Sequence, residues 1–268
     1  MSRNLSVIGV GNMAKAIIGG ILASDMAIDK IFLYDKYPEC CSAFKDNDRF
    51  AIVDSIEDAI RFGDVVLLSV KPQNYPEILN EIKSSLDYKD KLYISIGAGI
   101  SVKSVSDALD GANVVRVLPN LPMTIGKGVS AICRNKKIEP NDFDFVTSVF
   151  MSAGGVILID ECEMNRIIGV TSSSPAYVFK FIDAICKGAA AQGLDENTVL
   201  DAVCDMVIGS AMLLKTSNET PSALISKVAS KGGTTEQALI KLENGEFDKI
   251  IKEAMIACTA RANELGKQ

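Results

Sequence analysis

Histidine is absent from this 268-residue chain. Its absence excludes histidine metal sites, Ser-His-Asp and Cys-His catalysis, and a histidine general acid. The seven cysteines include no C-x-x-C pair, and their odd number, in a chain without a secretory leader, argues against a disulfide framework. Any chemistry therefore depends on a cofactor, hydroxyls, lysines, carboxylates or backbone dipoles, and we expect no metal.

Positive charge is also scarce. The 28 lysines and arginines are outnumbered by 34 acidic residues, and the net charge of −6 offers no basic field for nucleic acid. No uninterrupted apolar run reaches the roughly 18 residues of a membrane span. The chain enters a predicted strand at once, with no charged and apolar leader before it. We therefore expect a cytoplasmic protein with neither nucleic acid nor membrane as a partner.

Residues 1–160 alternate short apolar runs with helical patterns, the rhythm of a doubly wound, Rossmann-like α/β domain. Several runs are apolar at nearly every position, as in strands that are buried on both faces. The predicted strands are Asn4–Gly9, Lys30–Tyr34, Asp64–Val70, Leu92–Gly97, Asn113–Leu118, Gly128–Cys133 and Gly155–Asp160. The predicted crossover helices are Met13–Ser24, Pro38–Lys45, Pro76–Leu86, Ser104–Leu109 and Asp142–Met151.

Residues 161–268 lack this β pattern and predict an all-α second domain. Its helices are expected over Pro175–Ala191, from Asp195 or Asn197 to Thr216, after Pro221, after Thr234 and over Phe247–Glu264. The stretch Val199–Leu214 is apolar or small on almost every face, so it requires burial. A domain of about 110 residues can hardly enclose it alone, and we infer burial against a second subunit.

The first glycine-rich turn, Gly9-Val10-Gly11-Asn12-Met13-Ala14, follows a predicted strand and opens a predicted helix. In that context Gly9 permits the tight turn, Gly11 lets phosphates approach, and Ala14 keeps helix and strand close. The pattern predicts a dinucleotide-binding loop, and the alternative is a purely structural glycine turn.

Three further segments end predicted strands at the edge where a dinucleotide binds. Asp35 lies about where an acid holds the adenosine ribose, which favours NADH, whereas the adjacent Lys36 could reach the 2′-phosphate of NADPH. Lys71 and the small residues Gly97-Ala98-Gly99 could approach the cofactor. An ordinary turn residue at Asp35 and a solvated lysine at Lys71 are the alternatives.

The second glycine-rich turn runs over Ser230-Lys231-Gly232-Gly233-Thr234-Thr235 and opens a predicted helix. Backbone N–H groups at a helix N-terminus favour an anion, and we expect this one to bind a small carboxylate, with a Ser230 hydroxyl beside it. Thr234 and Gln237 have the spacing of a capping box. A glycine-rich helix entry without a ligand is the alternative.

Two charged pairs receive no function. Glu161 with Glu163, and Lys136 with Lys137, have the pattern of a solvated surface.

Taken together, these residues resemble the pyrroline-5-carboxylate reductase family, and the likeness runs from end to end. The most specific parts are two motifs that a generic Rossmann dehydrogenase lacks: Ser173-x-Pro175-Ala176-Tyr177 and Ser230-x-Gly232-Gly233-Thr234-Thr235. The others are the Gly9–Ala14 loop, Val70-Lys71-Pro72, Ala98-Gly99 and Asn120-x-Pro122 followed by Gly128.

The chain also departs from the family pattern. Ser172 and Ser174 stand where glycine or alanine is usual, and Lys231 replaces a proline. Leu121 replaces threonine, and Thr220 stands where histidine is frequent. Lys231 changes the loop's stiffness and adds positive charge beside the expected carboxylate site.

The resemblance implies NADPH- or NADH-dependent reduction of 1-pyrroline-5-carboxylate to L-proline. It implies cofactor contacts from the first loop (Gly9, Gly11, Asn12, Met13, Ala14), from Asp35 and Lys36, from Val70, Lys71 and Pro72, and from Ala98, Gly99 and Asn120. Substrate contacts would come from Ser230, Gly232, Gly233, Thr234 and Thr235, with the Thr235 hydroxyl at the ring nitrogen as a catalytic group.

The resemblance further implies a homodimer of intertwined helical domains, which can assemble into a decamer. Each active site would lie between one subunit's Rossmann domain and its partner's helical domain. Two alternatives remain at this point: a β-hydroxyacid dehydrogenase-like oxidoreductase, and a non-catalytic dinucleotide-sensing protein.

Overall fold

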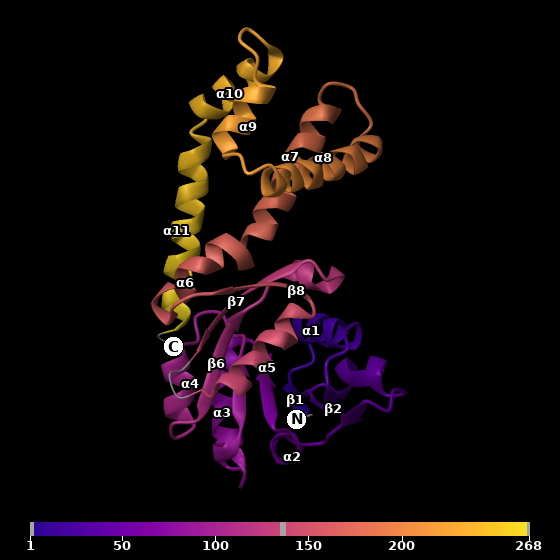
Figure 1. The fold of residues 1–268 in the computed structure, drawn as a ribbon, viewed down its shortest axis with the longest axis vertical. Helices are drawn as coiled ribbons and strands as arrows, with labels where there is room; N and C mark the ends of the chain where they lie inside the picture. Colours follow the sequence, from indigo (N-terminus) through magenta and orange to yellow (C-terminus); the bar gives the residue numbers. More distant parts are fainter. Residues whose placement is uncertain (1–2, 135–137, 267–268) are drawn as a thin grey trace. The chain divides into compact units, whose positions relative to one another are not determined.

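The computed structural model describes residues 3–134 and 138–266, so Lys136 and Lys137 lie outside the described residues. The chain forms two compact units (Figure 1). The first comprises Met1–Pro175 with Ile256–Gln268, and the second comprises Ala176–Met255. The predicted boundary between two domains at residue 160 remains a prediction, because a division into compact units does not test where one domain ends and the next begins.

The first unit is built on an eight-stranded sheet of order β3-β2-β1-β4-β5-β6-β7-β8. Its strands are β1 (Arg3–Ile8), β2 (Ile28–Tyr34), β3 (Phe50–Ile52), β4 (Val65–Leu68), β5 (Leu92–Ser95), β6 (Asn113–Leu118), β7 (Gly128–Arg134) and β8 (Gly154–Leu158). The order reverses at β1, where β2 and β4 flank it, and this is the switch point of a doubly wound fold.

One strand pair breaks the parallel pattern, since β7 runs antiparallel to β6 while all other neighbours are parallel. Residues 119–127 connect the two strands through the short 3₁₀ turn Leu121–Ile125. A parallel crossover needs a dozen or more residues, so this connection can only return the chain alongside β6.

Alternate strand residues supply the two faces of the sheet. On β1, Leu5 and Val7 pack into one buried cluster with α1 (Asn12–Leu22) and α5 (Pro140–Met151). Ile8 joins the other cluster, beneath α2 (Ile56–Phe62), α3 (Tyr75–Lys83) and α4 (Val102–Ala108). This period of two, in a strand covered on both sides, explains the continuous apolar run in the sequence.

All seven predicted strands and all predicted helices of the first unit are present, with the segment after Pro38 forming a 3₁₀ helix over Pro38–Phe44. The sequence pattern did not predict β3 and α2. β3 has three residues, too few to show a period, and α2 is a seven-residue helix that begins where Ser55 caps the N–H of Asp58.

The segment after β8 holds a 3₁₀ turn (Glu161–Glu163), α6 (Met164–Ile167) and a π-helical turn (Ile168–Ser172). The remaining helices are α7 (Ser174–Ala190), α8 (Glu196–Thr216), α9 (Pro221–Val228), α10 (Thr234–Asn244) and α11 (Phe247–Leu265). They confirm the expected helical second half of the chain.

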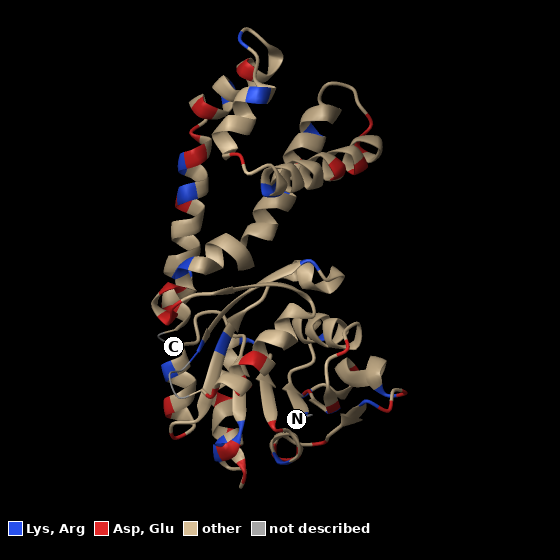
Figure 2. Cartoon of the chain, viewed as in Figure 1, with Lys and Arg blue, Asp and Glu red and all other residues tan. Residues whose placement is uncertain are grey.

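The second unit buries very little of its own apolar surface. On α7, α8, α9 and α10 the buried residues are Cys186, Ala189 and Val203. Figure 2 shows charges along α11 and around the sheet, and long uncharged stretches on α7 and α8. Exposed apolar side chains on α8 include Leu200, Met206, Ile208, Met212 and Leu213.

By length and composition, α8 is also apolar enough to cross a membrane, although no run of apolar residues alone reaches that length. Single helices of this kind are weak evidence for a membrane span, because the core helix of a soluble protein passes the same test. Within α8, Asp201 and Asp205 interrupt the apolar run.

A buried arginine joins several elements of the first unit. Arg116, on β6, is 2% exposed and donates to Glu161 Oε1 at 3.0 Å and to Asn165 Oδ1 at 2.6 Å. Glu161 also accepts from the backbone N–H of Val102 at the start of α4, at 3.1 Å, and from the Cys133 thiol at 2.5 Å. Burial and the nearby Glu161 raise the pKa of that thiol.

The prediction that Glu161 belongs to a solvated charged pair is therefore wrong. Its neighbour in sequence, Glu163, is exposed. The two differ because a buried guanidinium on a distant strand faces only one of them, and a sequence pattern does not report that contact.

We expect Glu161→Ala to lower the free energy of unfolding by about 3 kcal/mol, because it leaves Arg116 buried without a counter-charge. This value is at the lower end for buried pairs, since the Glu161 side chain is 37% exposed. The matched control, Glu163→Ala, should change stability by less than about 0.5 kcal/mol. Urea denaturation of the two variants makes the comparison, and equal effects would contradict it.

Candidate functional site

Gly9 positions the first glycine-rich turn between the neighbouring strands. Its φ of +92° lies in the region that favours glycine, and a Cβ there would stand 2.9 Å from the Ser69 carbonyl oxygen. Its N–H donates to the carbonyl of Tyr34 at 2.8 Å. Gly9 therefore shapes the turn.

Gly11 leaves the start of α1 open. It is the N-cap of that helix, no side chain caps the helix, and its first turn contains no acidic residue. No atom lies within 4 Å of the position that a Gly11 Cβ would take. The N–H groups and the positive end of the helix dipole are thus available to an anion, as a pyrophosphate requires.

A cavity of about 590 Å³ adjoins this helix start. Its wall comes from the turn after β1, from the carboxyl ends of β4, β5 and β6, and from the π-helical turn. It contains seven predicted cofactor residues, namely Gly11, Asn12, Met13, Val70, Lys71, Pro72 and Ala98. The other wall residues are Ser69, Ile96, Gly97, Leu118, Pro119, Ile168 and Ser172.

Three further predicted cofactor residues support the site from outside the wall. Ala14 is fully buried beneath the turn. A Cβ on Gly99 would meet the Ala262 carbonyl oxygen at 2.6 Å, so Gly99 allows α11 to pass closely. Asn120 donates to the Thr171 carbonyl at 3.0 Å and accepts from the N–H of Val129 at 2.9 Å.

Asp35 also supports the turn. One carboxylate oxygen accepts from the N–H of Val10 at 2.7 Å, and the other accepts from the N–H of Tyr37 at 2.9 Å. The carboxylate therefore ties β2 to the glycine-rich turn. The Lys36 side chain is 75% exposed and lies 4.0 Å from Glu77, a long ion pair.

Tyr75, which no sequence pattern singled out, fixes the strand ends behind the cavity. Its hydroxyl accepts from the N–H of Gly97 at 3.0 Å, and it lies 3.1 Å from the Leu68 carbonyl and 3.0 Å from Ser95 Oγ. Burial raises the pKa of Tyr75 to about 12, so the hydroxyl remains protonated at neutral pH.

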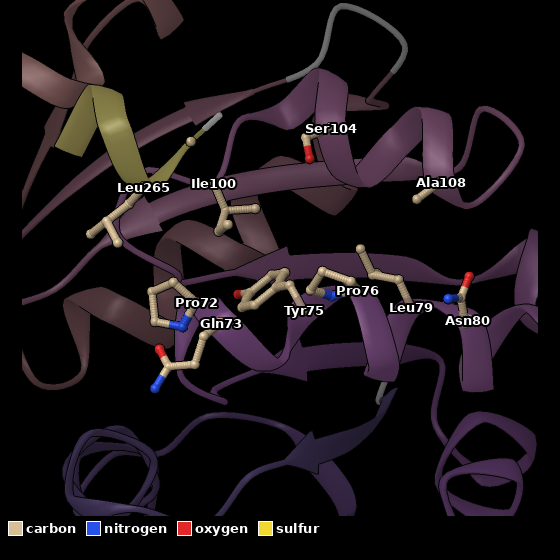
Figure 3. A pocket seen from close by; sticks show the side chains of 11 residues that line it. Pro72, Gln73, Tyr75, Pro76, Leu79, Asn80, Ile100, Ser104, Ala108 and Leu265 are labelled. Atoms are coloured by element: carbon tan, nitrogen blue, oxygen red, sulfur yellow. The ribbon is translucent and has the colours of Figure 1, made fainter. Parts of the chain in front are cut away.

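Tyr75 also lines a second cavity of about 370 Å³, between α3 and α4 (Figure 3). Pro72 belongs to both cavities. Among the residues that the structure describes, none that lines the second cavity is charged.

The second glycine-rich turn has backbone groups that are already engaged. Gly232, with φ +74°, donates its N–H to Glu236 Oε2 at 2.7 Å. Gly233 donates to the Ser230 carbonyl at 2.9 Å and is the N-cap of α10. A Cβ on Gly233 would stand 2.5 Å from Ser230 Oγ, so the turn needs glycine there.

The predicted capping box of Thr234 and Gln237 is absent, since Gly233 is the N-cap and no side chain caps the helix. Glu236, one position earlier than Gln237, reaches back to the turn instead. The hydroxyl of Thr234 lies one residue too late to act as the cap.

The first cavity fits a nicotinamide dinucleotide. The uncapped start of α1 and the open space at Gly11 suit its phosphates, and the mostly apolar wall beyond β4 suits a nicotinamide ring. One wall residue, Ser172, has a buried Oγ with no hydrogen-bond partner among the described residues, as expected where a polar ligand group belongs. The fold and this cavity define a nicotinamide-dependent oxidoreductase.

Comparisons with known proteins agree with this class. Residues 4–99 match the family model described as NADP oxidoreductase, coenzyme F420-dependent, and residues 161–265 match that for pyrroline-5-carboxylate reductase dimerisation. The pyrroline-5-carboxylate reductase of Escherichia coli strain K12 is 33% identical, with all of both chains covered.

Solved structures agree as well. The Plasmodium falciparum pyrroline carboxylate reductase with NADP bound has a TM-score of 0.89 and 27% identity, with 98% of each chain covered. The 1-pyrroline-5-carboxylate reductase of Streptococcus pyogenes has a TM-score of 0.90 and 26% identity, with 98% of this chain and 99% of that one covered. The chain belongs to the pyrroline-5-carboxylate reductase family.

We expect Gly11→Val to weaken binding of a reduced nicotinamide dinucleotide at least tenfold, because the side chain enters the space for the phosphates. The fold should lose only about 1 kcal/mol, the cost of a poor N-cap residue. Gly9→Ala should instead destabilise the protein, by about 2 kcal/mol or more, since φ is positive and the Cβ meets strand backbone. Cofactor fluorescence titration and thermal unfolding separate the two effects, and normal binding by Gly11→Val would contradict the assignment.

Proposed function

We propose that the protein reduces 1-pyrroline-5-carboxylate to L-proline with a reduced nicotinamide dinucleotide. The observation that supports this most is a dinucleotide cavity and a Ser-x-Gly-Gly-Thr-Thr turn in one chain. Full-length similarity to relatives named for this reaction adds to it.

The reaction requires no covalent bond between the protein and the substrate. When bound, the cofactor would supply the hydride that adds to the imine carbon, and the protonated imine nitrogen would then be the amine of proline. Because the protonated imine is already electrophilic, the chain's task is to hold donor and acceptor carbons about 3–3.5 Å apart. Ala98 and Leu118 line the cavity and would lie against one side of a bound nicotinamide ring.

The substrate carboxylate is assigned to the turn over residues 230–235. Thr234 and Thr235 are the first two residues of α10, and no side chain caps this helix. Their N–H groups therefore lie at the positive end of the helix dipole. Ser230 adds a hydroxyl, and Gly232 and Gly233 shape the turn. Thr235 is assigned to the ring nitrogen, which its hydroxyl orients and polarises.

NADPH is the proposed coenzyme. Asp35 accepts one backbone N–H on each carboxylate oxygen and so holds the glycine-rich turn beside β2. Lys36 is exposed beside it and suits a 2′-phosphate. A solved relative holds NADP.

The functional form is proposed to be a homodimer, with the partner's helical unit completing each active site. The near absence of buried residues on α7, α8, α9 and α10 supports this, because exposed apolar helices of this size need a covering surface. Assembly of such dimers into a decamer, and a cytoplasmic location, complete the proposal.

The test of the function is oxidation of NADPH and of NADH, followed in parallel, by purified protein given 1-pyrroline-5-carboxylate. We expect turnover with a preference for NADPH. Tight cofactor binding without turnover of any cyclic imine would replace this function with dinucleotide sensing, and a preference for NADH would reassign the ribose pocket to Asp35.

Thr235→Val should lower turnover about tenfold to a hundredfold, the value of a hydrogen bond to a charged group. NADPH affinity should not change, since Thr235 does not line the cofactor cavity. Thr216→Val, which removes a hydroxyl bonded to the Met212 carbonyl on α8, is the control. Unchanged turnover in Thr235→Val would remove this residue from the mechanism.

Glu236→Gln should lower the KM for 1-pyrroline-5-carboxylate about threefold to tenfold. The carboxylate of Glu236 occupies the Gly232 N–H and repels a second carboxylate at the same turn, whereas a glutamine amide carries no charge. Glu243→Gln, near the other end of α10, is the matched control and should leave KM unchanged. A rise in KM for Glu236→Gln would mean that this carboxylate supports substrate binding.

Sedimentation equilibrium should give a mass of at least twice the 28.7 kDa of one chain. Ile208→Asp, which puts a charge on the exposed apolar surface of α8, should shift the protein toward the monomer and abolish turnover. A monomeric wild-type protein with full activity would contradict the dimer.

A further inference from the structure

Ser172 carries a buried hydroxyl that the fold leaves without a partner. Four buried side-chain atoms in the described residues have no hydrogen bond: Ser85 Oγ, Arg116 Nε, Thr147 Oγ1 and Ser172 Oγ. Of these four residues, only Ser172 belongs to the wall of the dinucleotide cavity. An unpaired buried hydroxyl costs about 1–3 kcal/mol, so its presence in a cavity wall indicates a ligand group that pairs with it.

The position of Ser172 assigns it to one half of the dinucleotide. The pyrophosphate belongs at the start of α1, and Asp35 and Lys36 place the adenosine half toward β2. A dinucleotide that crosses the switch point therefore lays its nicotinamide half over the carboxyl ends of β5 and β6. Ile96, Ala98 and Leu118 line the cavity there, together with Ile168 and Ser172.

This half of the wall is otherwise apolar in its side chains. Isoleucine, alanine, leucine, glycine and proline make up the rest of it, and none of them offers a polar side-chain atom. A nicotinamide ring has one polar substituent, its carboxamide, which can both donate and accept a hydrogen bond. A serine hydroxyl has the same two capacities.

We propose that the Ser172 hydroxyl hydrogen-bonds the carboxamide of the bound nicotinamide ring and fixes the orientation of that ring in the cavity. The inference rests on the proposed function only in its use of a nicotinamide dinucleotide. In the ligand-free protein Oγ is closed off from solvent, so the proposed contact requires a change of the Ser172 χ1 angle to a staggered well that faces the cavity.

The experiment measures the binding of two ligands and the thermal stability of the full-length protein. Isothermal titration gives dissociation constants for NADPH and for 2′-phospho-ADP-ribose, which ends before the nicotinamide ring, and thermal unfolding gives the Tm without ligand. Ser172→Ala should weaken NADPH binding about fivefold to twentyfold and leave 2′-phospho-ADP-ribose within about twofold. Its ligand-free Tm should be unchanged or higher, since an unpaired hydroxyl has been removed.

Thr171→Val is the matched control. The Thr171 hydroxyl is bonded to the Ile167 carbonyl at 3.3 Å, and this neighbouring residue does not line the cavity. The Thr171→Val variant should bind NADPH and 2′-phospho-ADP-ribose with the dissociation constants of the wild-type protein.

Unchanged NADPH binding in Ser172→Ala, or equal weakening of both ligands, would overturn the inference. These readouts do not require turnover. If 1-pyrroline-5-carboxylate is not reduced but Ser172→Ala loses NADPH selectively, the proposed function fails and the Ser172 assignment stands. If the wild-type protein turns over and Ser172→Ala shows no selective loss, the proposed function stands and the Ser172 assignment fails.

Discussion

The ion pair of Arg116 and Glu161 fixes the segment that completes the wall of the dinucleotide cavity. A guanidinium that is 2% exposed fixes the first turn after β8, and through Asn165 it reaches Asn263 on α11. That segment then delivers Ile168 and Ser172 to the cavity wall. A charge buried in the sheet therefore sets the position of residues that are far from it in the sequence. Its cost in desolvation is offset only while both partners are present.

Both glycine-rich turns place backbone N–H groups at the start of a helix, but only the turn before α10 has an N–H that is bonded to a carboxylate of the helix that follows it. At the start of α1, no acidic side chain lies in the first turn and the space over Gly11 is open. At the start of α10, Glu236 already holds the Gly232 N–H. The first turn is open to an anion, whereas an anion at the second turn would compete with the carboxylate of Glu236 for the Gly232 N–H. Lys231 lies in the same turn, so opposite charges act on any anion that approaches it.

The sequence was a good guide wherever the signal is local. Continuous apolar runs such as Val65–Leu68 identified strands, and the Gly9–Ala14 pattern identified the turn because strand and helix flank it. It failed where the outcome depends on a distant partner. Glu161 and Glu163 look alike in the sequence until Arg116 is placed. The sequence likewise cannot show that the Ser172 hydroxyl is buried without a hydrogen-bond partner, because this depends on the residues that the fold places around it.

The small interior of the helical unit couples its folding to the association of two chains. Since α7, α8, α9 and α10 bury only Cys186, Ala189 and Val203, these helices have scarcely any interior to stabilise them alone. Helix packing and chain association then become one equilibrium, governed by mass action. A newly made chain would expose this apolar surface until it meets another, so the cellular concentration of the protein would itself set the fraction of chains whose helical unit is packed.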